Sequence, residues 1–192
     1  TDANQRLMVA ELARIKAHLA GEEQESAMAT AAEIRTALSA QSAIDRLAEC
    51  FGLSPFERDI LLLCAGVEMD AKFASLCATA QSNPLRSYAT FSLALATLEE
   101  PHWSALSPIR PLRRWRLIEV AEETSLANAR LRIDERVLHF LAGVNYLDIR
   151  LEPLLQNSGV AATMADVQRK TAQAILEALH ERNAPVPVIQ LL

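Results

Sequence analysis

The chain has 192 residues, of which 51% are hydrophobic and 22% charged, a composition typical of a globular protein rather than a disordered one. Its formal net charge of −5 opposes binding of the whole chain to nucleic acid or to an anionic membrane, although a local basic patch is compatible with it. No apolar run approaches the roughly 18–20 residues of a membrane-spanning helix, and no signal peptide is visible.

Three cysteines, Cys50, Cys64 and Cys77, lie among apolar neighbours and form no CxxC or CxxH pair. This pattern indicates reduced core cysteines in a cytoplasmic protein rather than a disulfide or a metal site.

The N-terminal residues predict two helices. Residues 3–20 show apolar positions at helical spacing, and residues 26–40 form an Ala-rich helix with few large anchors. The cations expected on the opposite face of the first helix are Arg6, Arg14 and Lys16. We predict a helical hairpin extension over residues 1–41, which must lean on the following domain, on a second copy or on a partner, because it is too poor in bulky residues to form a core.

The segment from Ser54 to Gly66 predicts the central helix of the chain. Ser54 and Glu57 have the spacing of a capping box, and Pro55 falls at the first helical position. No polar residue interrupts residues 60–65, so this helix, expected over 55–68, belongs in the middle of a core.

Further short helices are predicted around it, followed by a hairpin. The helices are expected at 42–51 with a stop at Gly52, at 71–80 after Asp70, at 91–98 after Thr90 and at 135–142 after Asp134. Two β-prone segments, 117–120 and 131–133, flank a polar stretch. Three helices and then a hairpin are the element order of a winged helix, which we place at residues 42–150.

The remaining residues, 151–192, predict a linker, a helix from about 164 to 182, and an apolar strand at 186–192. The helix has Val167, Ile175 and Leu179 on its apolar face. The expected fold class is thus mainly α: a helical N-terminal extension, a winged-helix domain with a small β-hairpin, and a C-terminal linker helix.

No catalytic, cofactor-binding or metal-binding residue is predicted. His18, His102, His139 and His180 are scattered singly, and the nucleophile, zinc, dinucleotide and P-loop motifs do not occur.

One segment has chemical interest, namely the arginine cluster at 110–116. Its candidate contact residues, for a partner or for phosphate, are Arg110, Arg113, Arg114, Trp115 and Arg116. Arginine forks grip phosphate oxygens and tryptophan can stack. Alternatively, Leu112 and Trp115 pack inward while the arginines pair with acids. The local acids are Glu99, Glu100 and Glu119.

Charge favours a protein partner over DNA. The helix in the position of a DNA-reading helix, residues 91–98, contains no Lys or Arg and is followed by Glu99 and Glu100. The hairpin loop carries Glu122 and Glu123. A DNA-contacting surface would instead be basic.

Three blocks, residues 54–65, 111–118 and 131–143, resemble in that order the N-terminal region of a bacterial AAA-family ATPase group. Some members are encoded with contractile injection systems. The resemblance implies a winged helix ahead of an ATPase core that opens with residues 188–192. It also implies that the Walker motifs, with ATP and Mg²⁺, lie beyond Leu192, so that this part of the protein is not itself catalytic.

The resemblance implies a module that recruits a substrate or assembly partner, or contacts its own hexamer, with the helix at 164–182 transmitting motion. The alternative is a DNA-binding regulator that uses the cluster at 110–116 and an N-terminal helical dimer. A third alternative is a structural helical adaptor without a motor.

Overall fold

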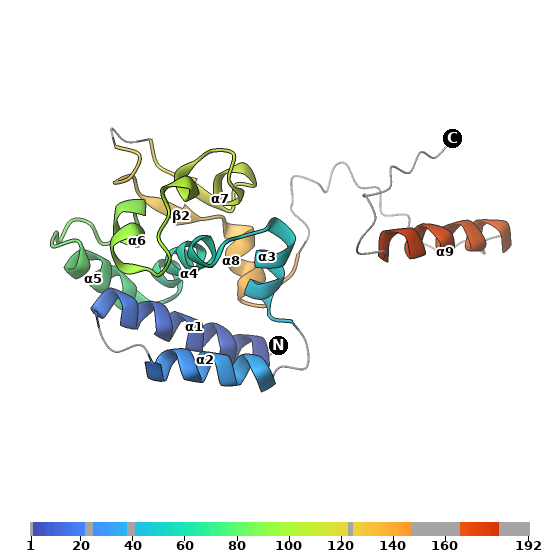
Figure 1. Cartoon of the computed structure of the whole chain (residues 1–192), viewed down its shortest axis with the longest axis horizontal. Coiled ribbons are helices and arrows are strands. Elements are labelled where there is room, and N and C mark those ends of the chain that lie inside the picture. The colour runs from blue at the N-terminus through green and yellow to red at the C-terminus, as the bar shows by residue number, and fades with distance from the viewer. Residues whose placement is uncertain (1, 22–24, 38–40, 123–124, 147–165, 181–192) are drawn as a thin grey trace. The chain divides into compact units, whose positions relative to one another are not determined.

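The computed structural model describes residues 2–21, 25–37, 41–122, 125–146 and 166–180 (Figure 1). The chain divides into two units, residues 1–146 and residues 147–192, each of which is described by itself. The described part is mainly helical with a small antiparallel sheet, as predicted. The first unit consists of α1 (Asp2–Ala20), α2 (Glu25–Ala37), α3 (Ala43–Phe51), α4 (Pro55–Met69), α5 (Ala71–Ala80), α6 (Phe91–Thr97), the 3₁₀ helix η1 (Trp103–Leu106), α7 (Pro111–Arg114), β1 (Ile118–Val120), β2 (Leu131–Ile133) and α8 (Glu135–Leu141), and in the second unit the structure describes α9 (Asp166–His180).

Helix α4 is the centre of the first unit, as its sequence predicts. The Ser54 side chain accepts from Glu57 N, the Glu57 carboxylate accepts from Ser54 N, and Pro55 occupies the first turn. Every residue from Ile60 to Gly66 is buried, so the helix contacts neighbours on all sides. A Cβ at Gly66 would overlap the Phe73 ring, and glycine therefore allows α5 to pack closely on α4.

The other predicted helix starts are also confirmed, because each depends on a local cap. Ser42, Asp70, Thr90 and Asp134 each accept a hydrogen bond from a backbone N–H in the first turn of α3, α5, α6 and α8. Gly52 ends α3 in the left-handed conformation with φ 64°.

The hairpin pairs β1 with β2 in antiparallel register, with Ile118 opposite Ile133 and Val120 opposite Leu131. Ile118, Leu131 and Ile133 are buried in the core. The backbone also ties the hairpin to the start of α6, since Leu131 N donates to Ala89 O at 2.9 Å and Ser92 N donates to Ala127 O at 2.7 Å. The first turn of α6 is thus held against the hairpin, the arrangement expected of a winged helix.

Helix α1 is part of the core rather than a projecting arm. It packs against α2, α4 and α5, and its Leu7 and Ile15 are fully buried. At its N-terminal end the Asn4 side chain accepts from Ala43 N at 2.8 Å and donates to Leu141 O at 3.0 Å. The sequence left open whether the N-terminal helical hairpin packs against the following domain, a second copy or a partner. In the structure it packs against the rest of the first unit.

Two placements expected from the sequence are wrong. Arg14, expected on the solvent face of α1, is 8% exposed because an acid from α4 draws it inward. Cys50, expected in the core, is exposed, because the inward stripe of α3 consists of Ile44, Leu47 and the partly buried Phe51. Cys64 and Cys77 are buried as predicted, and burial raises the pKa of the Cys77 thiol to about 11.

In the second unit, α9 lies within the helix predicted at 164–182. Ile175 on the predicted face is half-buried, whereas its neighbour Leu176 is 55% exposed. The side chains of Val167 and Leu179, the linker before Asp166 and the strand predicted at 186–192 lie outside the described residues. Among the helices that the structure describes, none combines the length and the hydropathy of a bilayer span.

Candidate functional site

The arginine cluster at 110–116 forms a short, well-anchored segment between η1 and β1. Leu112 is fully buried, and Leu117 N donates to Leu112 O at 2.9 Å. Arg113 Nη1 donates to Leu106 O at 2.7 Å, which ties α7 to η1. Neither α7 nor η1 was predicted, because each spans four residues and has no side-chain cap, although Pro111 at the first position of α7 is a helix-start signal.

Arg110 is committed to the start of the central helix. Its Nε and Nη2 donate to the two carboxylate oxygens of Glu57 at 3.0 and 2.6 Å, and the Glu57 side chain is fully buried. Burial alone would raise the pKa of Glu57, but the hydrogen bonds and charge of Arg110 and the bonds from Ser54 hold it below its ordinary value. The acid that pairs with Arg110 is therefore none of the three suggested by the sequence.

His102 adds a second tie to the same helix start. Its Nε2 lies 2.8 Å from Ser54 Oγ, and its Nδ1 lies 2.9 Å from Ser104 Oγ. A serine–histidine pair can serve as an activated nucleophile. Here the Ser54 Oγ already accepts from Glu57 N at 3.2 Å as a helix cap, and a hydroxyl rather than a carboxylate orients the imidazole. We assign the pair to holding the loop that precedes η1.

The outer side of the segment is apolar and cationic. Trp115 is 53% exposed, with its ring 5.9 Å from that of Phe51, and the guanidinium of Arg114 lies 5.1 Å from the Trp115 ring. Of the two residues that the alternative places in the interior, Leu112 is buried and Trp115 is exposed. We use the name Trp/Arg surface for the exposed large apolar residues and exposed arginines of residues 103–116, namely Trp103, Ile109, Arg114, Trp115 and Arg116.

Charge and exposure set this surface apart. Residues 101–118 contain four arginines and no Asp or Glu, in a chain of net charge −5. Trp103 is 67% exposed and Ile109 is 75% exposed. Grouped exposed aromatic residues with arginine are typical of binding surfaces. The sequence identified Arg114, Trp115 and Arg116, but it gave no reason to include Trp103 and Ile109.

A second arginine cluster, which the sequence did not reveal, lies buried between α1 and α4. Arg14 donates to both oxygens of Asp59, one at 2.8 Å, and its Nε donates to Glu11 at 3.0 Å. Arg58 Nη2 also donates to Glu11 at 2.7 Å. We name this the buried charge network; its buried members are Glu11, Arg14 and Asp59, with Arg58 largely buried beside them, and the exposed Arg35 of α2 and the partly exposed Asp45 of α3 form its outer edge.

The network keeps Glu11 ionised. Burial alone would raise the pKa of Glu11, but hydrogen bonds and charges from Arg58, Arg14 and Arg35 lower it below the ordinary value. A signal for this network was present in the sequence. Leu7, Glu11, Arg14 and His18 share one face at helical spacing, so polar residues occupy core positions of α1.

His18 ends this polar stripe in a state that opposes protonation. Its Nε2 lies 3.4 Å from Arg14 Nη1, and because a guanidinium can only donate, Nε2 must be the acceptor. The proton then sits on Nδ1, which is buried and has no hydrogen-bond partner among the described residues. Burial, and then the charge of Arg14, lower the pKa of His18 below its ordinary value.

The surface where winged helices read DNA is different. Helix α6 has no Lys or Arg, and it gives Phe91, Leu93 and Ala94 to the core. The arginines near the hairpin contact neighbours: Arg86 Nη1 donates to Asn128 at 3.0 Å, and the guanidinium of Arg130 lies 5.7 Å from the Tyr88 ring. Among the described residues, no group of His, Cys, Asp and Glu could hold a metal ion.

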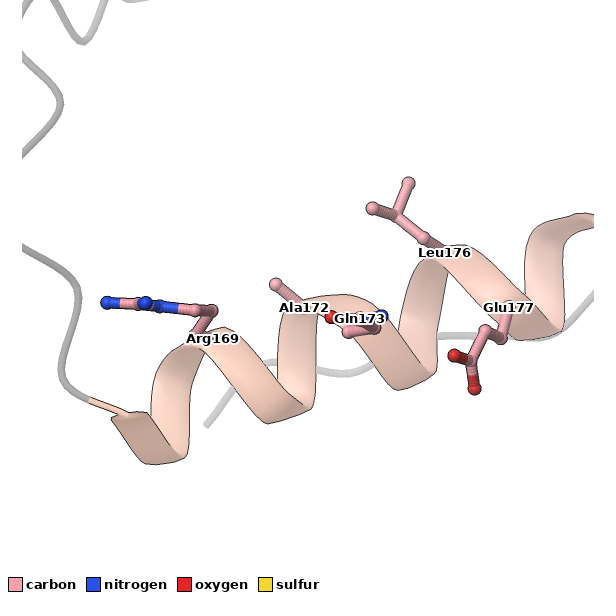
Figure 2. A pocket seen from close by; sticks show the side chains of 5 residues that line it. All are labelled: Arg169, Ala172, Gln173, Leu176 and Glu177. Atoms are coloured by element: carbon pink, nitrogen blue, oxygen red, sulfur yellow. The ribbon is translucent and has the colours of Figure 1, made fainter.

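In the second unit, a shallow hollow runs along α9 itself. Figure 2 shows its lining side chains, all from this helix: Arg169, Ala172, Gln173, Leu176 and Glu177.

The chain matches a known family of domains. A family model described as "Winged helix domain, variant" matches residues 1–155, which include α1 and α2 as well as the hairpin. No curated protein and no solved structure matches the chain.

Proposed function

The chain belongs to the family of variant winged helix domains, and on that premise we propose that it is a contact module that binds a protein partner through the Trp/Arg surface. In this proposal the described part of the chain binds a partner and does not catalyse a reaction. It presents a rigid, positively charged aromatic surface to a substrate, an assembly partner or a neighbouring subunit.

One observation carries the proposal: exposed aromatic residues and cations gather on residues 103–116 and not on α6. Trp115 is 53% exposed beside Arg114, whereas α6 contributes no cation and buries its apolar residues. Aromatic residues and arginine are enriched at protein interfaces, where they act as anchors. A DNA-reading helix would instead need exposed polar and basic side chains.

The anchoring of the segment supports the same role. Arg110 is bound to Glu57 by two hydrogen bonds, and Leu112 is buried. These ties hold Trp115 and its neighbours in place before any partner arrives, which reduces the entropy lost on binding. The absence of acids from residues 101–118 suits a partner with acidic groups around an apolar contact.

We propose further that the module precedes the ATPase core of an AAA-family protein in the cytoplasm. The support is the resemblance of residues 54–65, 111–118 and 131–143 to the N-terminal region of that group, some of whose members accompany contractile injection systems. In such a parent, ATP and Mg²⁺ bind the core beyond Leu192, and the helix that contains α9 links the two parts.

Two measurements test the parent. Sequencing the gene beyond codon 192 should show Walker motifs. ATP turnover should be present in the full-length protein and absent from residues 1–192. Turnover by residues 1–192 alone, or a reading frame that ends near Leu192, would contradict the assignment.

A pull-down from the native host tests the contact itself. Full-length Arg114→Ala/Arg116→Ala should lose the partners that the wild type retains. The matched control Lys72→Ala/Arg136→Ala removes the same charge from exposed positions outside the surface and should retain them. Equal recovery by both variants would contradict the proposal.

DNA binding is the second candidate, and one observation favours it. Arg114 and Arg116 are exposed beside an exposed indole, a combination that can hold phosphate and stack on a base. This candidate predicts a gel shift at low salt that weakens steeply as salt rises and is lost in Arg114→Ala/Arg116→Ala. The proposed protein contact predicts no shift at low salt.

A further inference from the structure

We infer that α9 pairs with α9 of a second copy of this chain in antiparallel orientation. The inference concerns the second unit alone and is independent of the Trp/Arg surface. It begins from the hollow in Figure 2, whose lining residues have the spacing i, i+3, i+4, i+7 and i+8. Such residues share one face of a helix.

The centre of this face is apolar and small. Leu176 is 55% exposed, Ala172 beside it is half-buried, and the hollow between them is open to solvent. A leucine from another helix fits over an alanine, because the small side chain lets the two helix axes approach.

The two ends of the face carry opposite charges. Arg169 lies towards the N-terminal end and Glu177 lies eight residues further on, which is about 12 Å along the axis. A matching surface must present the same charges in reverse order. The same face turned through a two-fold axis does so, because Arg169 of each copy then comes within reach of Glu177 of the other.

The two-fold arrangement satisfies every feature of the face at once. With the axis near Gln173, Leu176 of each copy lies between Arg169 and Ala172 of the other, and two Arg169–Glu177 pairs form. This is an isologous contact, in which one surface complements itself. The antiparallel orientation also places the positive end of each helix dipole beside the negative end of the other.

The size of the contact sets its strength. Helix α9 has 15 residues, so the pair buries less surface than a standard stable interface. We therefore expect a weak, concentration-dependent dimer, of the kind that strengthens when other parts of a protein already hold two copies together.

Sedimentation equilibrium of the full 192-residue chain at low ionic strength, over roughly 5–500 μM, tests the pairing in the range expected for so small an interface. The wild type should show a monomer–dimer equilibrium. Arg169→Glu and Glu177→Arg each make both symmetric pairs repulsive, and each should weaken dimerisation about five- to thirtyfold. The double variant Arg169→Glu/Glu177→Arg restores two pairs of opposite charge and should return to within about twofold of the wild type.

Two controls keep the test specific. Ala174→Lys and Ala174→Glu put new charges on an exposed position of α9 outside this face and should change dimerisation by less than about twofold. Circular dichroism of each variant shows whether the helix persists. A chain that stays monomeric throughout, or a double variant no tighter than the single ones, would overturn the inference.

Discussion

Two arginine-rich regions of the first unit use the same side chain in opposite ways. In the buried charge network, Arg14 and Arg58 lie between α1 and α4 and are bound to Glu11 and Asp59. In the segment at 110–116, Arg114 and Arg116 are exposed, and the 18 residues around them contain no acid. Where an arginine lies thus depends on which acids reach it.

The same contrast is found among the arginines of the segment at 110–116. Arg110 behaves like the members of the network, because it is bound to the buried carboxylate of Glu57. Arg114 behaves differently, with its guanidinium over the exposed ring of Trp115. We therefore expect stability to depend on the buried arginines and on Arg110, and binding to depend on Arg114 and Arg116.

The largest expected effect is on the buried charge network. Asp59→Ala removes the bidentate partner of Arg14, which keeps only Glu11, and leaves the network with one positive charge in excess; this should lower the free energy of unfolding by up to about 3–5 kcal/mol. Urea denaturation measures it. The double variant Asp59→Leu/Arg14→Met replaces the pair with apolar groups and should recover much of the loss. A loss below about 1 kcal/mol in Asp59→Ala would show that the pair is not buried as described.

A smaller loss is expected at Arg110. Arg110→Ala leaves the buried Glu57 carboxylate without its bidentate partner, which should cost about 1–3 kcal/mol in unfolding free energy. Adding Glu57→Gln removes the unpaired charge while keeping a side chain that suits the capping box, so the double variant should be the more stable of the two. If Arg110→Ala has the same urea midpoint as the wild type, the Arg110–Glu57 pair does not contribute to stability and the expectation is wrong.

The effect of His18 should appear as a pH dependence. Its pKa is lowered in the folded protein, so the unfolded chain takes up the proton more readily below the ordinary value of 6.5. The folded state therefore keeps the stability that depends on neutral His18 above pH 6.5. As the pH falls below 6.5, the free energy of unfolding decreases with a slope of at most about 1.4 kcal/mol per pH unit.

His18→Gln isolates this effect, because the other titrating groups cancel in the difference between the two proteins. Urea unfolding at pH 7.5 and pH 5.5 should therefore show a larger loss in the wild type than in the variant. Below the ordinary carboxyl pKa of 4.5, protonation of Glu11 and Glu57 should begin to destabilise both proteins. A wild type that loses no more stability than His18→Gln would contradict the assigned environment of His18.

The smallest effect on stability is expected on the Trp/Arg surface. Arg114→Ala/Arg116→Ala removes two exposed side chains, so its unfolding free energy should stay within about 0.5 kcal/mol of the wild type. The same urea titrations provide the comparison. A loss as large as that of Arg110→Ala would place these arginines among the structural ones.

The division between local and distant interactions explains what the sequence could predict. Ser54, Asp70 and Thr90 cap helices through atoms two or three residues away, so the helix starts were visible. The pairs Arg14–Asp59 and Arg110–Glu57 join residues 45 and 53 positions apart, and no periodicity encodes them. The candidate segment could be found from its composition, but which of its arginines face solvent depends on Glu57, a residue of another helix.

Quenching of tryptophan fluorescence tests the central claim most directly, because Trp103 and Trp115 are the two tryptophans of the chain and both are exposed. In a Trp103→Phe variant, Trp115 reports alone. The ratio of iodide quenching to caesium quenching should exceed that of free N-acetyltryptophanamide, because an anion is attracted and a cation repelled, and Arg114→Ala/Arg116→Ala should reduce this ratio. An emission spectrum typical of a buried indole, or an iodide-to-caesium quenching ratio no greater than that of free N-acetyltryptophanamide, would contradict an exposed, positively charged aromatic surface at this position.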